Sequence, residues 1–261
     1  MMARLLRRRE MAKNLFALEL VVDGLETKPV AGQFFMLYPP RDDLVLGRPI
    51  SAYGCRVEGG ASILEFLVKR VGGGTAAILD LPEGAELRLL GPLGSGFDAE
   101  PEADRICLVA GGYGVAPLRF YMRSLLDAGR DVYLVHGYKR AEEILSAEEL
   151  GLPADRVFCA CESDAGVFVG TAFELWRSKV AEIGAGLTVA CGPAGLLKAL
   201  QCECERNGWP LSVSLEARMG CGFGVCFSCA VPMKGGGYAR ACYDGPVFDA
   251  SAIDWDRFDS A

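Results

Sequence analysis

Four cysteines near the C-terminus have the spacing of a metal-cluster site. Four residues separate Cys221 from Cys226, two separate Cys226 from Cys229, and twelve separate Cys229 from Cys242. This C-x4-C-x2-C…C pattern is typical of plant-type [2Fe–2S] sites, in which soft thiolates hold two irons. Glycines at 220, 222 and 224 would let the loop curl around the cluster. We therefore predict that these cysteines ligate a cluster and that the protein carries single electrons; structural zinc sites more often pair C-x2-C units.

The cysteine count supports this prediction. The chain has 11 cysteines, and an odd number argues against a fully paired disulfide framework. No apolar segment of a secretory leader follows the basic N-terminus, so we expect a cytoplasmic protein with reduced thiols. Ligation would then explain four of the cysteines.

Two glycine-containing turns indicate a nucleotide site. The segment Ala110–Pro117 contains Gly111, Gly112 and Gly114, follows an apolar run and opens a helical pattern. Glycines in such a turn let a pyrophosphate approach the backbone and the helix N-terminus. Cys191-Gly192-Pro193 follows a later apolar strand, at the sheet end where ligands bind in open α/β folds. The first turn does not match GxGxxG, so an ordinary tight strand–helix turn is the alternative.

Two segments of the first hundred residues have side chains suited to a phosphate and a polar ring. Gly72-Gly73-Gly74-Thr75 precedes a short helical pattern and could cradle a phosphate. Arg48-Pro49-Ile50-Ser51 begins a predicted strand; its guanidinium suits a phosphate, and its hydroxyl can bond a polar ring. Taken alone, the second segment is better explained by an ordinary exposed arginine.

Composition limits the class of protein. The chain has 261 residues, of which 51% are apolar, enough for two domains and a small appendage. Its net charge of −7 argues against a broad nucleic-acid surface. No apolar run reaches the roughly 18 residues of a membrane span, so neither nucleic acid nor membrane is an expected partner. The arginines at positions 4, 7, 8 and 9 are interpreted as a solvated leader.

The elements that would position these residues fall into three parts. Residues 1–101 are predicted to form an antiparallel β-barrel, because short strands recur between turn residues; the predicted strands are Leu15–Val22, Phe34–Tyr38, Pro49–Tyr53, Ser62–Val68 and Glu86–Leu90. Residues 102–214 alternate strands with helices and predict a parallel sheet covered on both faces. Residues 215–261 show little periodicity and are predicted to form a small cluster domain.

Together these motifs resemble the ferredoxin–NADP reductase-like flavoproteins. The chain has their order of parts: an Arg-Pro-x-Ser barrel segment, a glycine-rich nucleotide turn and a Cys-Gly-Pro turn. Its final segment, Met219–Cys226 followed by Cys242–Phe248, resembles the electron-transfer subunits of NAD-linked, two-subunit dihydroorotate dehydrogenases. The resemblance covers nearly the whole chain, from about Arg9 to Asp249.

The resemblance implies FAD, a [2Fe–2S] cluster and NAD(H) as cofactors. It implies that Ser51, near the flavin ring, and Cys191, at the nicotinamide nucleotide, are catalytic residues. The residues implied to bind FAD are Arg48, Pro49, Ile50, Ser51, Leu67, Val68, Lys69, Gly74 and Thr75. Those implied to position the nucleotide are Gly111, Gly112, Gly114, Gly192 and Pro193.

The resemblance also implies a partner and a pathway. The partner would be an FMN-containing dihydroorotate dehydrogenase catalytic subunit, in a heterotetramer with two copies of each chain. Electrons would pass from its FMN through the cluster and FAD to NAD⁺, within pyrimidine biosynthesis. No motif for oxidising dihydroorotate itself is evident in this sequence.

Several residues leave details open. Lys69 stands where the family usually has arginine, and Tyr113 stands where an aliphatic residue is commoner, so the ring of Tyr113 could crowd or stack on the nucleotide. Lys139 and Arg140 could contact a ribose 2′-phosphate and favour NADP, with ordinary surface charge as the alternative. His136, the only histidine, is interpreted as packing at a strand end.

Two other functions fit parts of the sequence. One is the small subunit of an NADH-dependent ferredoxin–NADP transhydrogenase, in which an aspartate replaces one cysteine ligand; here all four positions are cysteine. The other is a redox sensor that uses the state of a flavin or cluster to alter binding. A sensor would pass no electrons to a dye. The identity of the partner protein would distinguish the transhydrogenase subunit from the dihydroorotate dehydrogenase subunit.

Overall fold

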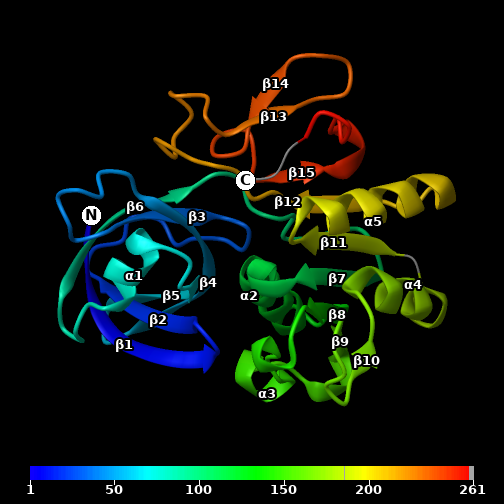
Figure 1. Cartoon of the computed structure of the whole chain (residues 1–261), viewed down its shortest axis with the longest axis horizontal. Helices are drawn as coiled ribbons and strands as arrows, with labels where there is room; N and C mark the ends of the chain where they lie inside the picture. Colours follow the sequence, from blue (N-terminus) through cyan, green and yellow to red (C-terminus); the bar gives the residue numbers. More distant parts are fainter. Residues whose placement is uncertain (185, 259–261) are drawn as a thin grey trace.

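The computed structural model of the protein describes residues 1–184 and 186–258 (Figure 1). It consists of a barrel, a sheet covered by helices and a C-terminal segment of short strands that lies across both. The predicted fold class, a barrel followed by a parallel sheet and a cluster segment, is confirmed.

Six antiparallel strands close the barrel in the order β1-β2-β5-β4-β3-β6. Their bounds are β1 (Met2–Ala12), β2 (Leu15–Val22), β3 (Phe34–Tyr38), β4 (Arg48–Glu58), β5 (Ala61–Lys69) and β6 (Glu86–Leu93). Alternate residues point inwards, as β-strand geometry requires, and form the barrel core. The short helix α1 (Gly73–Leu79) adds Ile78 and Leu79 to that core.

The N-terminal segment corrects one expectation. The arginine-rich residues are not a solvated leader but the strand β1, which pairs with β2 and β6 and closes the barrel. Ala3 and Leu5 are buried, while the arginines are exposed on the outer surface. Only three small or apolar side chains of this strand are buried, so its alternation was hidden by its charges.

The second part is a seven-stranded sheet in the order β10-β9-β8-β7-β11-β12-β15. All neighbours are parallel except β12 and β15. The strand bounds are β7 (Arg105–Gly111), β8 (Asp131–Tyr138), β9 (Val157–Cys161), β10 (Phe168–Val169), β11 (Leu187–Cys191), β12 (Leu211–Ser214) and β15 (Val247–Asp249).

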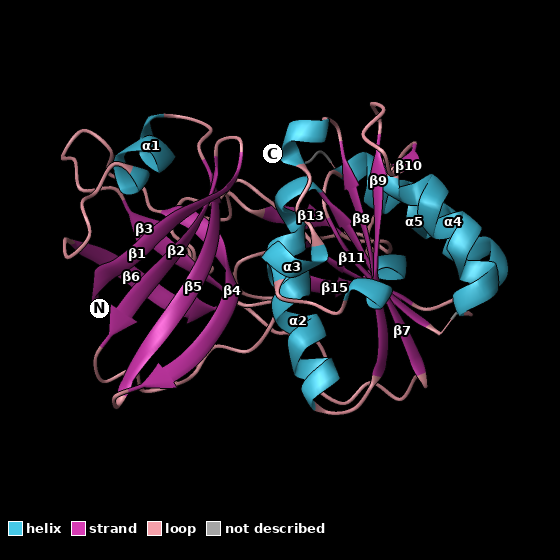
Figure 2. Cartoon of the chain, turned by 90° about the horizontal axis from the view of Figure 1, so that it is seen from below, coloured by secondary structure: helices cyan, strands magenta, loops and turns pink. Residues whose placement is uncertain are grey.

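Helices cover both faces of this sheet (Figure 2). On β7, Ile106 and Leu108 pack in the cluster that contains the helix α2, whereas Cys107 and Val109 pack in the cluster of α4 and α5. A parallel sheet buried in this way needs continuous apolar strands, which the sequence supplies. The helices are α2 (Val115–Asp127), α3 (Ala147–Leu150), α4 (Ala172–Ile183) and α5 (Ala194–Asn207). Among the described residues, no helix combines the length and apolar character needed to cross a membrane.

The C-terminal segment is built on the sheet. A hairpin of β13 (Ala230–Pro232) and β14 (Tyr238–Arg240) is followed by β15, which pairs with β12. Buried Val231 and Ile253 belong to the same apolar cluster as Leu200 of α5. The segment therefore shares the core of the sheet.

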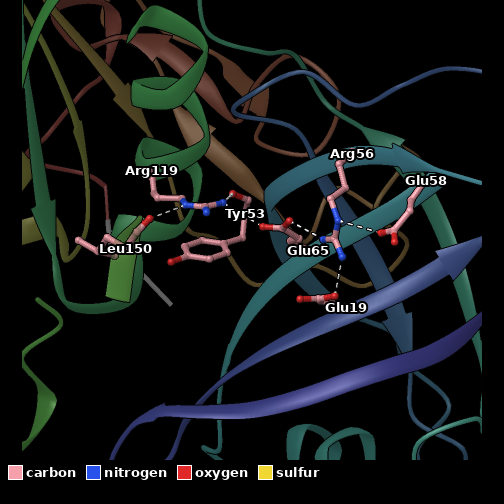
Figure 3. A network of polar contacts seen from close by, with 7 residues as sticks. All are labelled: Glu19, Tyr53, Arg56, Glu58, Glu65, Arg119 and Leu150. Carbon is pink, nitrogen blue, oxygen red and sulfur yellow. Dashed lines mark hydrogen bonds and ion pairs between the residues drawn. The ribbon is translucent and has the colours of Figure 1, made fainter. Parts of the chain in front are cut away.

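A polar clamp joins the barrel to the sheet (Figure 3). The Arg119 guanidinium on α2 donates to the Tyr53 carbonyl at 3.0 Å and to the Glu65 carboxylate at 3.0 Å, both in the barrel. It also donates to the Leu150 carbonyl at 2.9 Å, and Glu65 accepts a second bond from Arg56 at 2.8 Å. Because the Arg119 side chain is only 12% exposed, these bonds hold the two parts in one orientation.

Candidate redox and nucleotide sites

A cavity of about 250 Å³ lies where the barrel, the sheet and the C-terminal segment meet. Ser51 of β4 and Cys191, at the carboxyl end of β11, both line it. The structure thus brings together two predicted catalytic residues that are 140 positions apart in the chain. We name this space the ring cavity. The other predicted residues that line it are Pro49, Ile50, Leu67, Lys69 and Thr75.

Cys191 is a neutral thiol in this setting. Burial raises the pKa of its thiol, and the nearby Glu216 carboxylate raises it further. Burial likewise raises the pKa of Glu216. A buried, uncharged thiol at this position suits a ring system better than a phosphate.

Three of the predicted FAD residues, Arg48, Val68 and Gly74, do not line the ring cavity. Val68 points into the barrel core, opposite to Leu67 and Lys69, because neighbouring side chains of a strand alternate. The Arg48 guanidinium lies against Gly74, where a Cβ would come within 2.1 Å of Nε. The hydroxyl of Thr75 accepts bonds from the Val71 and Gly72 amides at 3.0 and 3.2 Å and so stabilises its own turn.

The pairing of Arg48 with Gly74 fits the phosphates of FAD. Only a residue without a side chain leaves room for a guanidinium at the start of α1. The charge and the open backbone are therefore at one place, beside a cavity suited to the ring.

A second cavity, of about 630 Å³, lies along the carboxyl ends of the sheet strands. Predicted residues Gly111, Gly112, Gly192 and Pro193 line it. Gly114 does not: a Cβ there would lie 2.5 Å from the Cys191 carbonyl oxygen, so this glycine allows α2 to start against β11. We name this space the nucleotide cavity; its size and its glycine edges fit a dinucleotide.

His136 holds the glycine turn through a hydrogen bond to Gly112. Its Nε2 lies 2.7 Å from the Gly112 carbonyl oxygen, and its Nδ1 lies 2.7 Å from the Tyr138 hydroxyl. Burial lowers the pKa of His136 to about 4, so the ring is neutral, with Nε2–H donating to Gly112 and the tyrosine donating to Nδ1. The predicted packing role thus includes holding the nucleotide turn.

The two cavities share three residues, one from each part of the chain. Lys69 comes from the barrel, Tyr113 from the glycine turn, and Glu216 from the start of the C-terminal segment. Lys69 Nζ lies 5.6 Å from the centre of the Tyr113 ring and forms a 3.0 Å ion pair with Glu143. Tyr113 and Glu216 line both cavities together, and the Glu216 carboxylate raises the pKa of the Tyr113 phenol.

The far wall of the ring cavity belongs to the cluster segment. Met219, two residues before Cys221, and Pro246, four residues after Cys242, both line the cavity. The cluster loop itself lies on the barrel, since a Cβ at Gly222 would come within 2.6 Å of Met36.

The four cysteines form two pairs. Cys229 and Cys242 are buried with their sulfurs 3.2 Å apart, whereas Cys226 is exposed and Cys221 is intermediate. Backbone amides point at three of the sulfurs: Cys221 N to Cys226 at 3.4 Å, Val225 N to Cys221 at 3.4 Å and Gly224 N to Cys242 at 3.1 Å.

This arrangement of paired thiols fits two irons. A [2Fe–2S] cluster places two ligands on each iron, so paired thiols suit it. Bonds from Ser228 and Cys221 lower the pKa of the Cys226 thiol to about 6, which favours the thiolate that iron requires.

Sequence reasoning missed Glu216, which lies in both cavities. Its signal was weak: a lone carboxylate directly after the short strand Leu211–Ser214, just before the cysteine-rich loop. Glu162 and Phe173, which line the nucleotide cavity, were missed for the same reason, because only the folded chain brings them beside the glycine turns.

Comparisons with known families agree with this geometry. Residues 216–254 match the family model described as the iron–sulfur cluster binding domain of dihydroorotate dehydrogenase B. Residues 108–156 match the oxidoreductase NAD-binding domain.

Relatives match over almost the full length. The dihydroorotate dehydrogenase B (NAD(+)) electron transfer subunit of Desulforamulus reducens is 31% identical over 94% of both chains, and that of Geobacillus sp. strain WCH70 is 32% identical over 95% of both. A solved NADH-dependent reduced ferredoxin–NADP oxidoreductase has a TM-score of 0.84 at 23% identity, covering 97% of this chain and 90% of that one. Ferredoxin NADP⁺ reductase from Neisseria gonorrhoeae has a TM-score of 0.64 at 16% identity, covering 78% and 90%. These two likenesses concern the fold.

Proposed function

This chain belongs to the family of electron-transfer subunits of NAD-linked dihydroorotate dehydrogenase B, and from that premise we propose how its sites divide the reaction. The chain is an oxidoreductase subunit with FAD, a [2Fe–2S] cluster and NAD(H) as its cofactors. One observation supports the proposal above all: the nucleotide cavity and the ring cavity share Lys69, Tyr113 and Glu216, and Met219 and Pro246, close to cluster cysteines in the chain, line the ring cavity.

The ring cavity is the proposed flavin site. When bound there, FAD exchanges a two-electron hydride for single electrons, which is the chemistry that the relay needs. Arg48 and Gly74 hold its phosphates, Ser51 contributes a hydroxyl at the ring, and the neutral Cys191 thiol borders the ring on the sheet side. Pro49, Ile50 and Leu67 exclude water from this space.

The nucleotide cavity is the proposed site of NAD⁺ reduction. Gly111, Gly112 and Gly192 leave room for the pyrophosphate, and the neutral His136 fixes the Gly112 carbonyl. Tyr113, which lines both cavities, would border the nicotinamide. The chain thus orients the nucleotide towards the flavin site from the carboxyl ends of its strands.

The four paired cysteines are the proposed cluster ligands, and the loop that bears them is the proposed partner face. The name of the family implies a catalytic partner subunit. Exposed apolar side chains surround the solvent-side pair, and such patches mark protein interfaces. They are Phe223, Val225, Phe227 and Tyr243. We propose that an FMN-containing catalytic subunit docks here, with two copies of each chain in the complex.

Anaerobic titration of the purified protein with NADH, and separately with NADPH, tests the function. We expect NADH to bleach flavin and iron–sulfur bands in sequence and to produce an EPR signal. Cys226→Ser should abolish the EPR signal and leave flavin reduction, while Cys202→Ser, an exposed cysteine on α5, should change neither. If Cys226→Ser kept a full cluster, the ligand assignment would be refuted. If the NADH-reduced protein passed no electrons to an added dye, a redox sensor would be favoured over an electron carrier.

A further inference from the structure

One side chain touches both parts of the cluster site. Arg240 ends β14, two residues before the ligand Cys242. Its Nη1 donates to the Gly224 carbonyl at 3.0 Å, and the Gly224 amide in turn points at the Cys242 sulfur at 3.1 Å. Arg240 thus connects the loop carrying Cys221 and Cys226 to the turn carrying Cys242.

The guanidinium of Arg240 is fixed on its other sides. Nε and Nη2 bind the Asp244 carboxylate at 3.0 and 3.2 Å, and the Arg240 amide binds it at 2.8 Å. The same guanidinium lies over the rings of Tyr243, at 4.4 Å, and Phe227, at 5.2 Å. A planar cation with this set of contacts has one orientation, with Nη1 towards the cluster loop.

The contact with Phe227 stabilises an unusual backbone. Phe227 lies between the ligands Cys226 and Cys229 and has φ +58°, in the left-handed region that bulky residues rarely adopt. Strain of this kind persists only where neighbouring contacts impose it, and it occurs at functional sites. The Arg240 stack is such a contact.

We propose that Arg240 is a positioning residue that sets the reduction potential of the cluster, an inference that rests on the proposed cluster site. The reduced cluster carries one more negative charge than the oxidised one. A fixed positive charge beside it and an amide held on a ligand sulfur both favour the reduced form, so both raise the potential. Asp244 opposes the first effect by partly neutralising the guanidinium.

Opposite signs distinguish this role from a merely structural one. Arg240→Gln removes the charge and loosens Gly224, so the midpoint potential should become more negative. Asp244→Asn keeps an oxygen acceptor for the arginine but removes the opposing charge, so the potential should become more positive. Arg240→Lys keeps the charge without the planar fork and should shift the potential less than Arg240→Gln.

The experiment is an EPR-monitored redox titration of the isolated holoprotein, with iron and sulfide measured in parallel. Arg257→Gln is the matched control, because Arg257 lies over the Tyr238 ring at 5.3 Å and pairs with Asp254 at 3.8 Å, in the same segment. We expect at least a tenfold change in the one-electron equilibrium for Arg240→Gln, about 59 mV, and none for Arg257→Gln.

Each result decides between the two proposals. An unchanged potential in a cluster-loaded Arg240→Gln protein, or shifts of the same sign in Arg240→Gln and Asp244→Asn, would overturn the role of Arg240. If Arg240→Gln loses its cluster, Asp244→Asn decides: a positive shift supports the role, and a zero or negative shift overturns it. Wild-type protein without iron or sulfide would instead refute the cluster site itself.

Discussion

The glycines of the nucleotide cavity lie at the ends of strands that are buried on both faces, whereas two of the cluster cysteines, Cys221 and Cys226, lie on a loop with exposed side chains. Around the nucleotide cavity, Val109 and Ala190 are fully buried, so packing fixes the strand ends, and the His136 hydrogen bond holds the turn at Gly112. Around the cluster, Cys226 and Val225 are exposed, and amide–sulfur and arginine contacts hold the loop. The first site can form before its ligand binds, while the second depends on its ligand for much of its order.

The largest expected effect tests the dependence of the loop on its cluster. Cys229→Ser removes one ligand of the buried pair, so the cluster should be lost and residues 219–245 should exchange amide hydrogens much faster. The β7 and β11 amides should keep their protection. Hydrogen exchange with mass spectrometry measures both, and equal deprotection of the sheet would contradict the contrast.

The clamp between barrel and sheet should rank second. Arg119→Leu removes the hydrogen-bond donor of the Tyr53 and Leu150 carbonyls and of one Glu65 carboxylate oxygen. We therefore expect a loss of about 2 to 3 kcal/mol in the free energy of unfolding. Arg123→Leu, one turn further along α2 with only a 3.3 Å bond to the Gly151 carbonyl, is the control and should lose far less. Urea unfolding measures both, and equal losses would refute the clamp.

The free energy of unfolding should depend on pH through His136, which holds the nucleotide turn. Its folded pKa of about 4 lies below its ordinary value of 6.5, so the unfolded chain binds the extra proton between these values. Its contribution to stability is therefore complete above pH 6.5 and falls as the pH drops towards 4. Between pH 7 and 5 the wild type should lose about 2 kcal/mol more than His136→Gln. Parallel pH curves of unfolding free energy would contradict this expectation.

The smallest effect concerns the junction of the two cavities. For the nicotinamide to reach the ring cavity, the Tyr113 ring must leave Lys69 and Glu216, whose contacts stabilise it by about 1 kcal/mol. Tyr113→Leu should therefore bind NAD⁺ about fivefold more tightly in calorimetry, and Tyr113→Phe should lie between leucine and wild type. Weaker binding by the leucine variant would mean that the ring stacks on the nucleotide instead.

Much of the fold followed from local pattern. Predicted strands at Leu15–Val22 and Phe34–Tyr38 coincide with β2 and β3, because each has a clear periodicity. The strand β1 was missed because arginines fill its outer face, and β15 was missed because three residues carry no periodicity.

The site was less accessible to sequence reasoning. The cysteine spacing identifies a ligand set, because all four residues serve one chemical purpose. The side-chain direction of Val68 also follows from a local rule, because strand alternation turns it away from Leu67 and Lys69. The placing of Glu216 between two cavities, by contrast, depends on three parts of the chain meeting. Such relations between distant residues leave no local pattern.

The pairing of β15 with β12 has a consequence for solubility. At this end of the sheet, Leu211–Ser214 is bordered on one side by β11 and on the other only by Val247–Asp249. Without these last residues, the backbone N–H and C=O groups of β12 would form an open edge, which is a template for adding strands from other molecules. A chain cut before Cys242 should therefore self-associate, and the segment that carries the cluster also protects the sheet against aggregation.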